Sequence, residues 1–157
     1  DWVYYIDKDL DPKLVEYGKN SVKAFGMKER FFHIEFFKTK DDYIAIEYNN
    51  RPAGAFAVDV YNFAHSTDYF RVYAEVVNGT FNGLNVDEKY GLASTRRDYK
   101  DYVYSDEDIR NKYQDKLKAV LRMPEAFAEL QGNTMYVLVA DTLEEMKEME
   151  RFVGKLK

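Results

Sequence analysis

Two carboxylates in a strand–turn–strand pattern constrain this chain more than any other feature. Glu35 lies in the aromatic-rich run FFHIEFFKT (31–39), and Glu47 lies in the run YIAIEYNNR (43–51). Both runs are typical of β-strands, and the polar residues 40–42 between them predict a turn. A hairpin folded about the middle of that turn places the two carboxylates directly opposite each other.

The same register predicts which other side chains share a face with the carboxylates. It pairs His33 with Asn49 and Phe37 with Ala45. Because side chains alternate along a strand, His33 and Asn49 project from the same face as the two acids. Like charges directly across a ladder are destabilising. We therefore infer that the pair is there to hold a positively charged group.

A divalent cation such as Mg²⁺ prefers ligands of this kind. It is usually held by one or two carboxylates together with substrate phosphates and water. Arg51 follows Asn49 by two residues, so it points the same way if the strand persists, and its guanidinium could hold a phosphate or carboxylate. These residues predict a site for phosphoryl chemistry. A solvated sheet face with polar residues is the structural alternative.

The spacing of these residues resembles a known signature. Glu35, a gap of twelve, then Glu47-x-Asn49-x-Arg51 is similar to the metal-binding motif of the ATP-grasp superfamily, in its carboxylate–amine ligase and biotin-carboxylase-like branch. The downstream run DVYNFAHSTDYFRVYAEVVNG resembles the helical segment that follows the motif in that branch. The clear likeness covers about residues 20–80.

The resemblance implies a function and a role for each matched residue. Glu35, Glu47 and Asn49 would bind the Mg²⁺ (or Mn²⁺) ions that carry the phosphates of ATP. Arg51 would contact the phosphate or the intermediate as the catalytic residue, and Phe37 would pack on the adenine ring. Such an enzyme activates a substrate carboxylate as an acyl phosphate for attack by an amine or another nucleophile. The substrate-handling residues that some branches carry after the Arg have no clear match here.

Composition excludes several other classes of protein. The chain has 157 residues, of which 46% are hydrophobic, and this suits a globular domain with its own core. The net charge of −5 argues against nucleic acid as the main partner. Cysteine is absent, and neither a membrane-spanning run nor a signal peptide is recognisable, so we expect a cytoplasmic protein. The Arg96-Arg97 pair is predicted to be a solvated strand end.

The expected architecture is α+β, an antiparallel sheet with flanking helices. It would resemble the C-terminal half of an ATP-grasp domain, with the metal-binding strands in residues 1–85 and a small α/β region in residues 86–157. In such ligases the ATP-binding lobe precedes the metal strands, so we expect the C-terminal portion of a longer ligase, inactive alone. Its partners would be ATP, a small-molecule carboxylate and the rest of the parent enzyme, with a homodimer left open.

Local signals place the other elements. Asp11-Pro12 predicts the start of a helix that Gly26 closes, and Thr142 with a Glu three residues later predicts the N-terminus of the last helix. The remaining expectations are a helical stretch over 57–78 interrupted near residue 65, a strand over 90–99, a helix after Ser105 that continues toward Pro124, a short helix or turn after Pro124, and a buried strand over 134–141.

Some residues and functions keep two interpretations. His33 and His65 could be catalytic, but a hydrogen-bonded structural role is favoured for both, and Asp59 is explained more simply as a helix N-terminal acid than as a ligand for a substrate amine. The alternative function is a non-catalytic interaction or dimerisation module with a vestigial acidic hairpin. A two-metal hydrolase ranks last because no further cluster of acids is visible.

Overall fold

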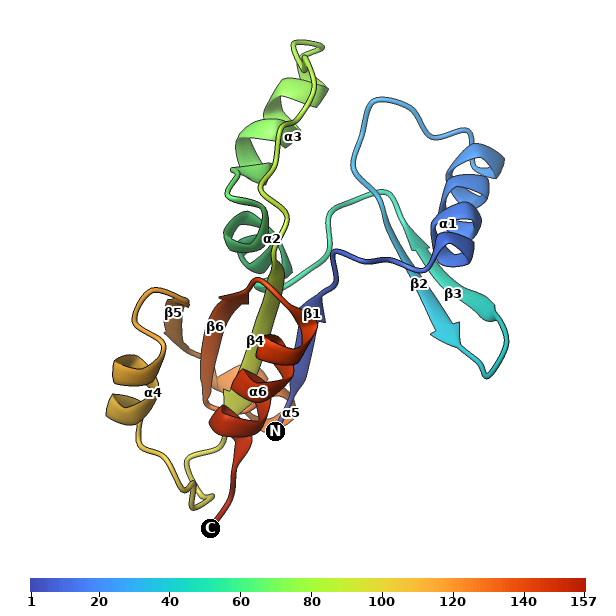
Figure 1. Ribbon diagram of the computed structural model, residues 1–157. Helices are drawn as coiled ribbons and strands as arrows, with labels where there is room; N and C mark the ends of the chain where they lie inside the picture. Colours follow the sequence, from blue (N-terminus) through green and yellow to red (C-terminus); the bar gives the residue numbers. More distant parts are fainter. The chain divides into compact units, whose positions relative to one another are not determined.

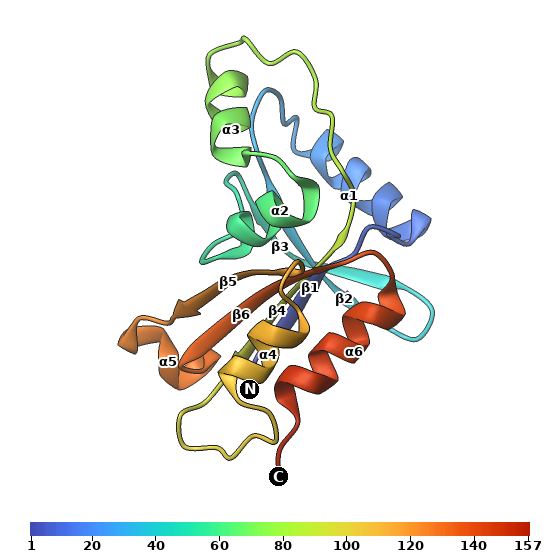
Figure 2. The same ribbon diagram turned by 60° about the vertical axis from the view of Figure 1, so that its left-hand side comes forward.

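The computed structural model describes all residues from 1 to 157, and they form two compact units (Figures 1 and 2). Unit 1 consists of residues 1–8, 60–66 and 87–157, and unit 2 consists of residues 9–59 and 67–86. Both contain antiparallel strands and helices, so the α+β class is confirmed. The division into lobes at residue 85 stays a prediction. No helix is both long and apolar enough to cross a membrane.

Unit 1 is built on a four-stranded antiparallel sheet with the strand order β1-β4-β6-β5. Its strands are β1 (Val3–Ile6), β4 (Tyr90–Arg96), β5 (Leu117–Arg122) and β6 (Thr134–Ala140). Its helices are α4 (Asp106–Lys112), α5 (Glu125–Gln131), α6 (Leu143–Gly154) and most of α2 (Ala57–His65).

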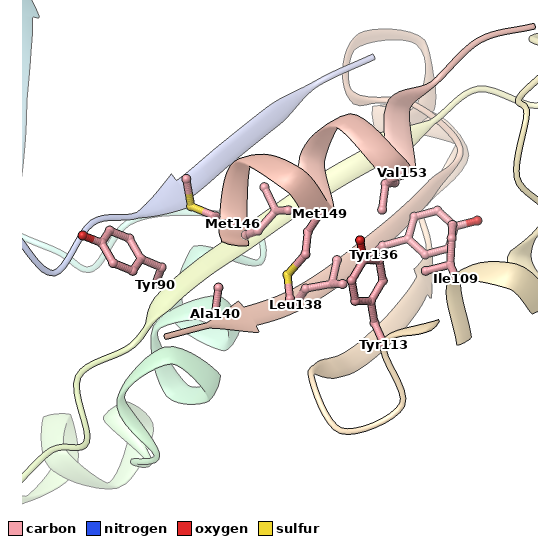
Figure 3. Packing of buried hydrophobic residues seen from close by; sticks show 10 residues of the cluster. Tyr90, Ile109, Tyr113, Tyr136, Leu138, Ala140, Met146, Met149 and Val153 are labelled. Carbon is pink, nitrogen blue, oxygen red and sulfur yellow. The ribbon is translucent and has the colours of Figure 1, made fainter. Parts of the chain in front are cut away.

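Helix α6 covers one face of this sheet and forms the main core (Figure 3). Met146, Met149 and Val153 recur at helical spacing, and all three are fully buried against β4 and β6. The Thr142 hydroxyl accepts a hydrogen bond from the Glu145 N–H, as expected for the N-cap of α6. The apolar run of β6 and the last helix are therefore confirmed.

The opposite face of the sheet receives α2 at a glycine. A Cβ on Gly91 would lie 3.0 Å from side-chain atoms of both Val60 and Ala64, so only glycine lets the helix approach this closely. The Asp87 N–H donates to the His65 carbonyl at 3.2 Å, and the Lys89 N–H donates to the Ala64 carbonyl at 3.0 Å. These two bonds bring together the ends of the segment 67–86.

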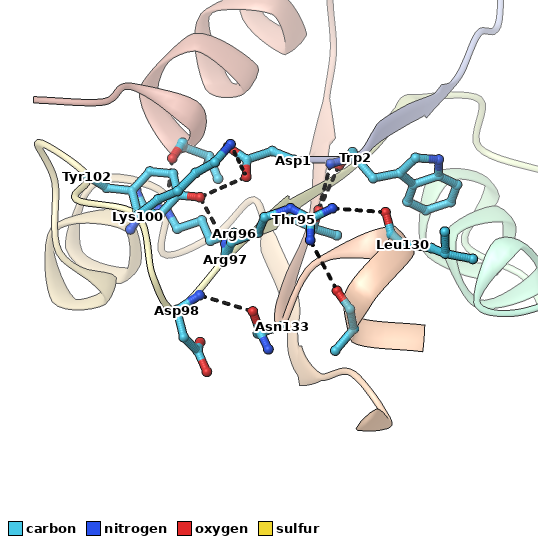
Figure 4. A network of polar contacts seen from close by, with 12 residues as sticks. Asp1, Trp2, Thr95, Arg96, Arg97, Asp98, Lys100, Tyr102, Leu130 and Asn133 are labelled. Atoms are coloured by element: carbon cyan, nitrogen blue, oxygen red, sulfur yellow. Dashed lines mark hydrogen bonds and ion pairs between the residues drawn. The ribbon is translucent and has the colours of Figure 1, made fainter. Parts of the chain in front are cut away.

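The Arg96-Arg97 pair is not a solvated strand end, and that prediction was wrong for a structural reason. Arg96 is buried, and its Nε and Nη1 donate to the carbonyls of Val153 and Tyr104, both at 2.8 Å. Arg97 donates to three carbonyls at the C-terminus of α5, including that of Leu130 (Figure 4). Cationic side chains satisfy helix-end carbonyls that would otherwise lack partners.

Two strands differ from the expectation. Residues 117–122 form β5, although the sequence predicted that the helix after Ser105 continues toward Pro124; α4 ends at Lys112. Pairing with β6 overrides the helical propensity of this lysine- and leucine-containing run. Residues 3–6 form β1, a strand that the sequence analysis did not predict, because they pair with β4.

Unit 2 contains a helix, a hairpin and a second helix. Helix α1 (Pro12–Ala24) is capped by the Asp11 carboxylate and ends before Gly26, whose φ of 63° closes it as predicted. The hairpin consists of β2 (His33–Lys38) and β3 (Tyr43–Asn49). After the predicted interruption, α3 (Tyr69–Val77) begins with Asp68 as its cap.

Candidate functional site

The hairpin brings the predicted polar residues to one face. Glu35 pairs directly with Glu47, and His33 pairs with Asn49, so this part of the predicted register is confirmed. Alternation along the two strands then sets these four side chains on one side of the ladder. Ile34 and Tyr48, the pair between them, point to the other side, where Tyr48 stacks on Phe25 with the ring centroids 4.0 Å apart.

The predicted pairing of Phe37 with Ala45 was wrong. The register shifts after Glu35, and Phe37 lies opposite Ile44 while Phe36 lies opposite Ala45. The physical reason is a β-bulge, in which β3 contains one additional residue, Ile46, between two successive pairs. Phe37 remains two residues from Glu35 on the same strand, and 64% of its surface is exposed.

Each carboxylate has a nitrogen-bearing side chain two residues away on its own strand. The Asn49 Nδ2 donates to Glu47 Oε1 at 2.7 Å, so the Oδ1 of Asn49 is free to face another group. The His33 Nε2 lies 3.7 Å from Glu35 Oε1, and the His33 Nδ1 is buried without a hydrogen-bond partner. The Glu35 side chain is 42% exposed, so a ligand can reach it.

Arg51 lies beyond the end of the strand. Strand β3 ends at Asn49, so the alternation argument does not extend to Arg51. Its Nη1 donates to the Pro52 carbonyl at 2.9 Å, and the side chain is exposed. The structure does not bring Arg51 into contact with the carboxylate pair, and its role stays a prediction.

Contacts with α1 hold the turn of the hairpin. Lys13 Nζ lies 3.1 Å from Asp42 Oδ1, and the Tyr43 hydroxyl donates to Asp11 at 2.8 Å. The Tyr43 N–H and then Lys13 lower the pKa of the Asp42 carboxyl, and the Tyr43 hydroxyl lowers that of Asp11. These bonds fix the turn about which the two carboxylates pair.

The donor set fits a hard cation only in part. Nowhere do three or more His, Cys, Asp or Glu side chains converge in a way that could hold a metal ion. The hairpin offers two carboxylates and one amide oxygen, which matches Mg²⁺ that is also bound by phosphate and water. The residues present therefore suit a cation that arrives with a phosphorylated ligand, rather than one caged by protein alone.

The other candidates do not join this face. Asp59 lies in the first turn of α2, as its simpler interpretation predicted. His65 belongs to unit 1, where burial lowers the pKa of its imidazole and the charge of Glu88 opposes that shift.

Comparison with known proteins identifies the fold. No protein-family model and no curated protein sequence matches the chain. Among solved structures it is similar to phosphoribosylglycinamide synthetase from Anaerococcus prevotii (TM-score 0.66, 12% identity) and to L-amino acid ligase from Bacillus licheniformis (TM-score 0.69, 15% identity). A third is the phosphoribosylaminoimidazole carboxylase ATPase subunit from Aquifex aeolicus (TM-score 0.61, 17% identity).

These matches cover nearly all of this chain but less than half of each solved chain. They cover 99%, 95% and 99% of this chain but only 44%, 43% and 46% of the respective solved chains. The chain thus spans less than half the length of each protein that it resembles. In its fold, the chain is similar to these ATP-grasp enzymes, over a stretch that corresponds to part of each.

Proposed function

We propose that this chain is the C-terminal portion of an ATP-dependent ligase and carries its metal-binding hairpin. The observation that carries the proposal is the direct pairing of Glu35 with Glu47, with Asn49 bonded to Glu47, on a hairpin within an ATP-grasp fold. Like charges held opposite each other are costly unless a cation compensates them. The fold and the motif point to the same chemistry independently.

Each residue has one role in this proposal. Glu35, Glu47 and the Oδ1 of Asn49 bind Mg²⁺, which neutralises charge on the phosphates of ATP. Phe37 offers an exposed ring for the adenine, and the Arg51 guanidinium steadies the transferred phosphoryl group. A substrate carboxylate oxygen attacks the γ-phosphorus, ADP leaves, and an amine or another nucleophile then displaces phosphate from the acyl phosphate.

A paramagnetic titration tests the metal assignment. Mn²⁺ is added to the isotope-labelled chain, and the loss of amide NMR signal is compared between the unchanged chain and Glu47→Gln. We expect broadening centred on residues 33–49 that weakens at least about tenfold in the variant, because one charged ligand is lost. Glu88→Gln, an exposed acid in unit 1, is the matched control. Equal broadening of residues 33–49 in the unchanged chain and Glu47→Gln would refute the assignment.

The alternative is a non-catalytic interaction module. The observation that favours it is the number of apolar side chains that unit 2 leaves exposed, among them Phe25, Phe32 and Phe70. Such a module would bind Mn²⁺ with no preference for the hairpin, so the same titration separates the two functions.

A further inference from the structure

Unit 2 lacks a core of its own. It accounts for roughly half of the chain, yet Val72 of α3 is its only buried residue. No residue of α1, β2 or β3 is buried, whereas the strands and α6 of unit 1 contain a continuous cluster of buried side chains. Burial of apolar surface is the main term that offsets the conformational entropy lost on folding, so unit 2 has much less burial to stabilise it than unit 1 has.

Two elements of unit 2, α3 and β3, each present more than one exposed apolar residue. On α3, Phe70, Tyr73 and Val77 recur at helical spacing, with Phe70 60% and Val77 61% exposed. We call these three residues the α3 stripe. On β3, Ile44 and Ile46 are 56% and 48% exposed.

The hairpin is also open along both of its outer edges. Strands β2 and β3 pair only with each other, so each has one edge without a ladder partner. A two-stranded hairpin is marginal in water, and further strands or a packed helix are needed to stabilise it. The open edge of the hairpin and the exposed isoleucines beside it together indicate that another polypeptide could extend this sheet.

We propose that the α3 stripe and the exposed Ile44 and Ile46 of β3 are where the remaining part of an ATP-grasp ligase docks, and that this docking stabilises unit 2 and the metal hairpin. The choice of partner rests on the proposed function. More than half of each similar solved chain has no counterpart here, which supplies a polypeptide of the required size. The metal face, which the chain alone forms with low stability, is then held in place by the partner.

Hydrogen exchange of the chain alone is the first measurement. We expect a monomer in which amides of β2, β3 and α3 exchange at least about a hundredfold faster than those of β4 and β6. A monomer whose two units exchange equally slowly would overturn the proposal. A dimer with a protected unit 2 would also overturn it, because the partner would then be a second copy.

A hybrid enzyme tests the partner itself. The whole chain replaces the matched stretch of the Bacillus licheniformis ligase, and exchange is measured again. We expect the amides of β2, β3 and α3 to slow by roughly a hundredfold, and Phe70→Ser with Val77→Ser to reverse this, while Leu130→Ser, equally apolar and exposed in unit 1, does not.

The hybrid distinguishes failure of the docking surface from failure of the proposed function. A folded hybrid whose unit 2 still exchanges rapidly contradicts the docking surface, and if no hybrid folds, the measurement on the chain alone decides. Mn²⁺ broadening at residues 33–49 is recorded in the same hybrid with and without Glu47→Gln. Protection without a hairpin-specific metal effect would leave the docking surface intact and refute the proposed function.

Discussion

At the scale of single residues, Arg96 joins three segments of unit 1. Its guanidinium donates hydrogen bonds to the carbonyls of Val153 in α6 and of Tyr104 in the loop between β4 and α4. The Cζ of Arg96 also lies 5.3 Å from the ring centroid of Tyr136 in β6. The Tyr136 hydroxyl is itself bonded to Asp106, and burial with this bond raises its pKa. A cation in this position satisfies carbonyls that no backbone N–H reaches.

Replacing this arginine should destabilise unit 1. We expect Arg96→Ala to lower the free energy of unfolding by about 2–4 kcal/mol, because one buried and one partly buried carbonyl lose their donors. Arg96→Lys should recover less than half of the loss, since one ammonium cannot reproduce both bonds. Urea unfolding followed by the fluorescence of Trp2, the only tryptophan and a residue of unit 1, measures both. Wild-type stability in Arg96→Ala would contradict this role.

Residue-level sequence reasoning succeeded where the rule was geometric. Alternation about a short turn was sufficient to pair Glu35 with Glu47. It failed at the bulge because nothing in the run YIAIEYN marks Ile46 as the additional residue. It also failed for Arg96, because an arginine at a strand end is ordinarily solvated, and only the fold places carbonyl groups around it.

At the scale of elements, one ion pair connects the loop after β4 to β5. Arg122 donates to Asp98 through two nitrogens, one of them at 2.7 Å. This contact lowers the pKa of Asp98 below its ordinary value of 3.8. The folded state therefore binds fewer protons here, so the contribution to stability is present above about pH 3.8 and is lost as the pH falls through the lowered pKa.

Removing the partner should remove part of this pH dependence. Arg122→Gln is expected to unfold at lower urea than the unchanged chain at neutral pH, and the difference should be smaller at about pH 3, below the ordinary pKa of 3.8, because protonation of Asp98 removes the ion pair. Trp2 fluorescence at the two pH values measures it, with Arg110→Gln on α4 as the control. A difference that is the same at both pH values would contradict the assignment.

Elements were predictable when their ends carried local signals. Asp11-Pro12 and Gly26 delimited α1, and Thr142 marked the start of α6. Strand β5 has no such signal, since it forms by pairing with β6, and a strand defined by a distant partner cannot be distinguished from the end of a helix by composition. The α3 stripe had a usable signal, because YFRVYAEVV is apolar around most of its circumference.

At the scale of the whole molecule, the two units should not unfold together. Trp2 reports on unit 1, whereas circular dichroism also reports on α1 and α3 of unit 2. We expect the isolated chain to lose part of its helical signal at lower urea than its Trp2 transition, because unit 2 has almost no buried surface. Coincident transitions of the two probes would show one cooperative unit instead.

The sequence could predict the fold class and the family resemblance of the molecule, but not that segments far apart in the chain would share one compact unit. The first eight residues join unit 1 through the pairing of Val3–Ile6 with β4, a contact across some ninety positions. The roles of Phe37, Arg51 and the three metal ligands remain predictions, because they depend on a bound ligand and on polypeptide outside this chain.

The two hydrogen bonds at Ala64 and His65 make the segment 67–86 a closed loop. Because unit 1 already joins the two ends of this loop, the entropy lost on closing it depends only weakly on the number of residues between them. Each doubling of such a loop costs about 0.6 kcal/mol. Unit 1 can thus accommodate insertions and deletions in this segment, and length changes in related chains should collect there rather than in the sheet.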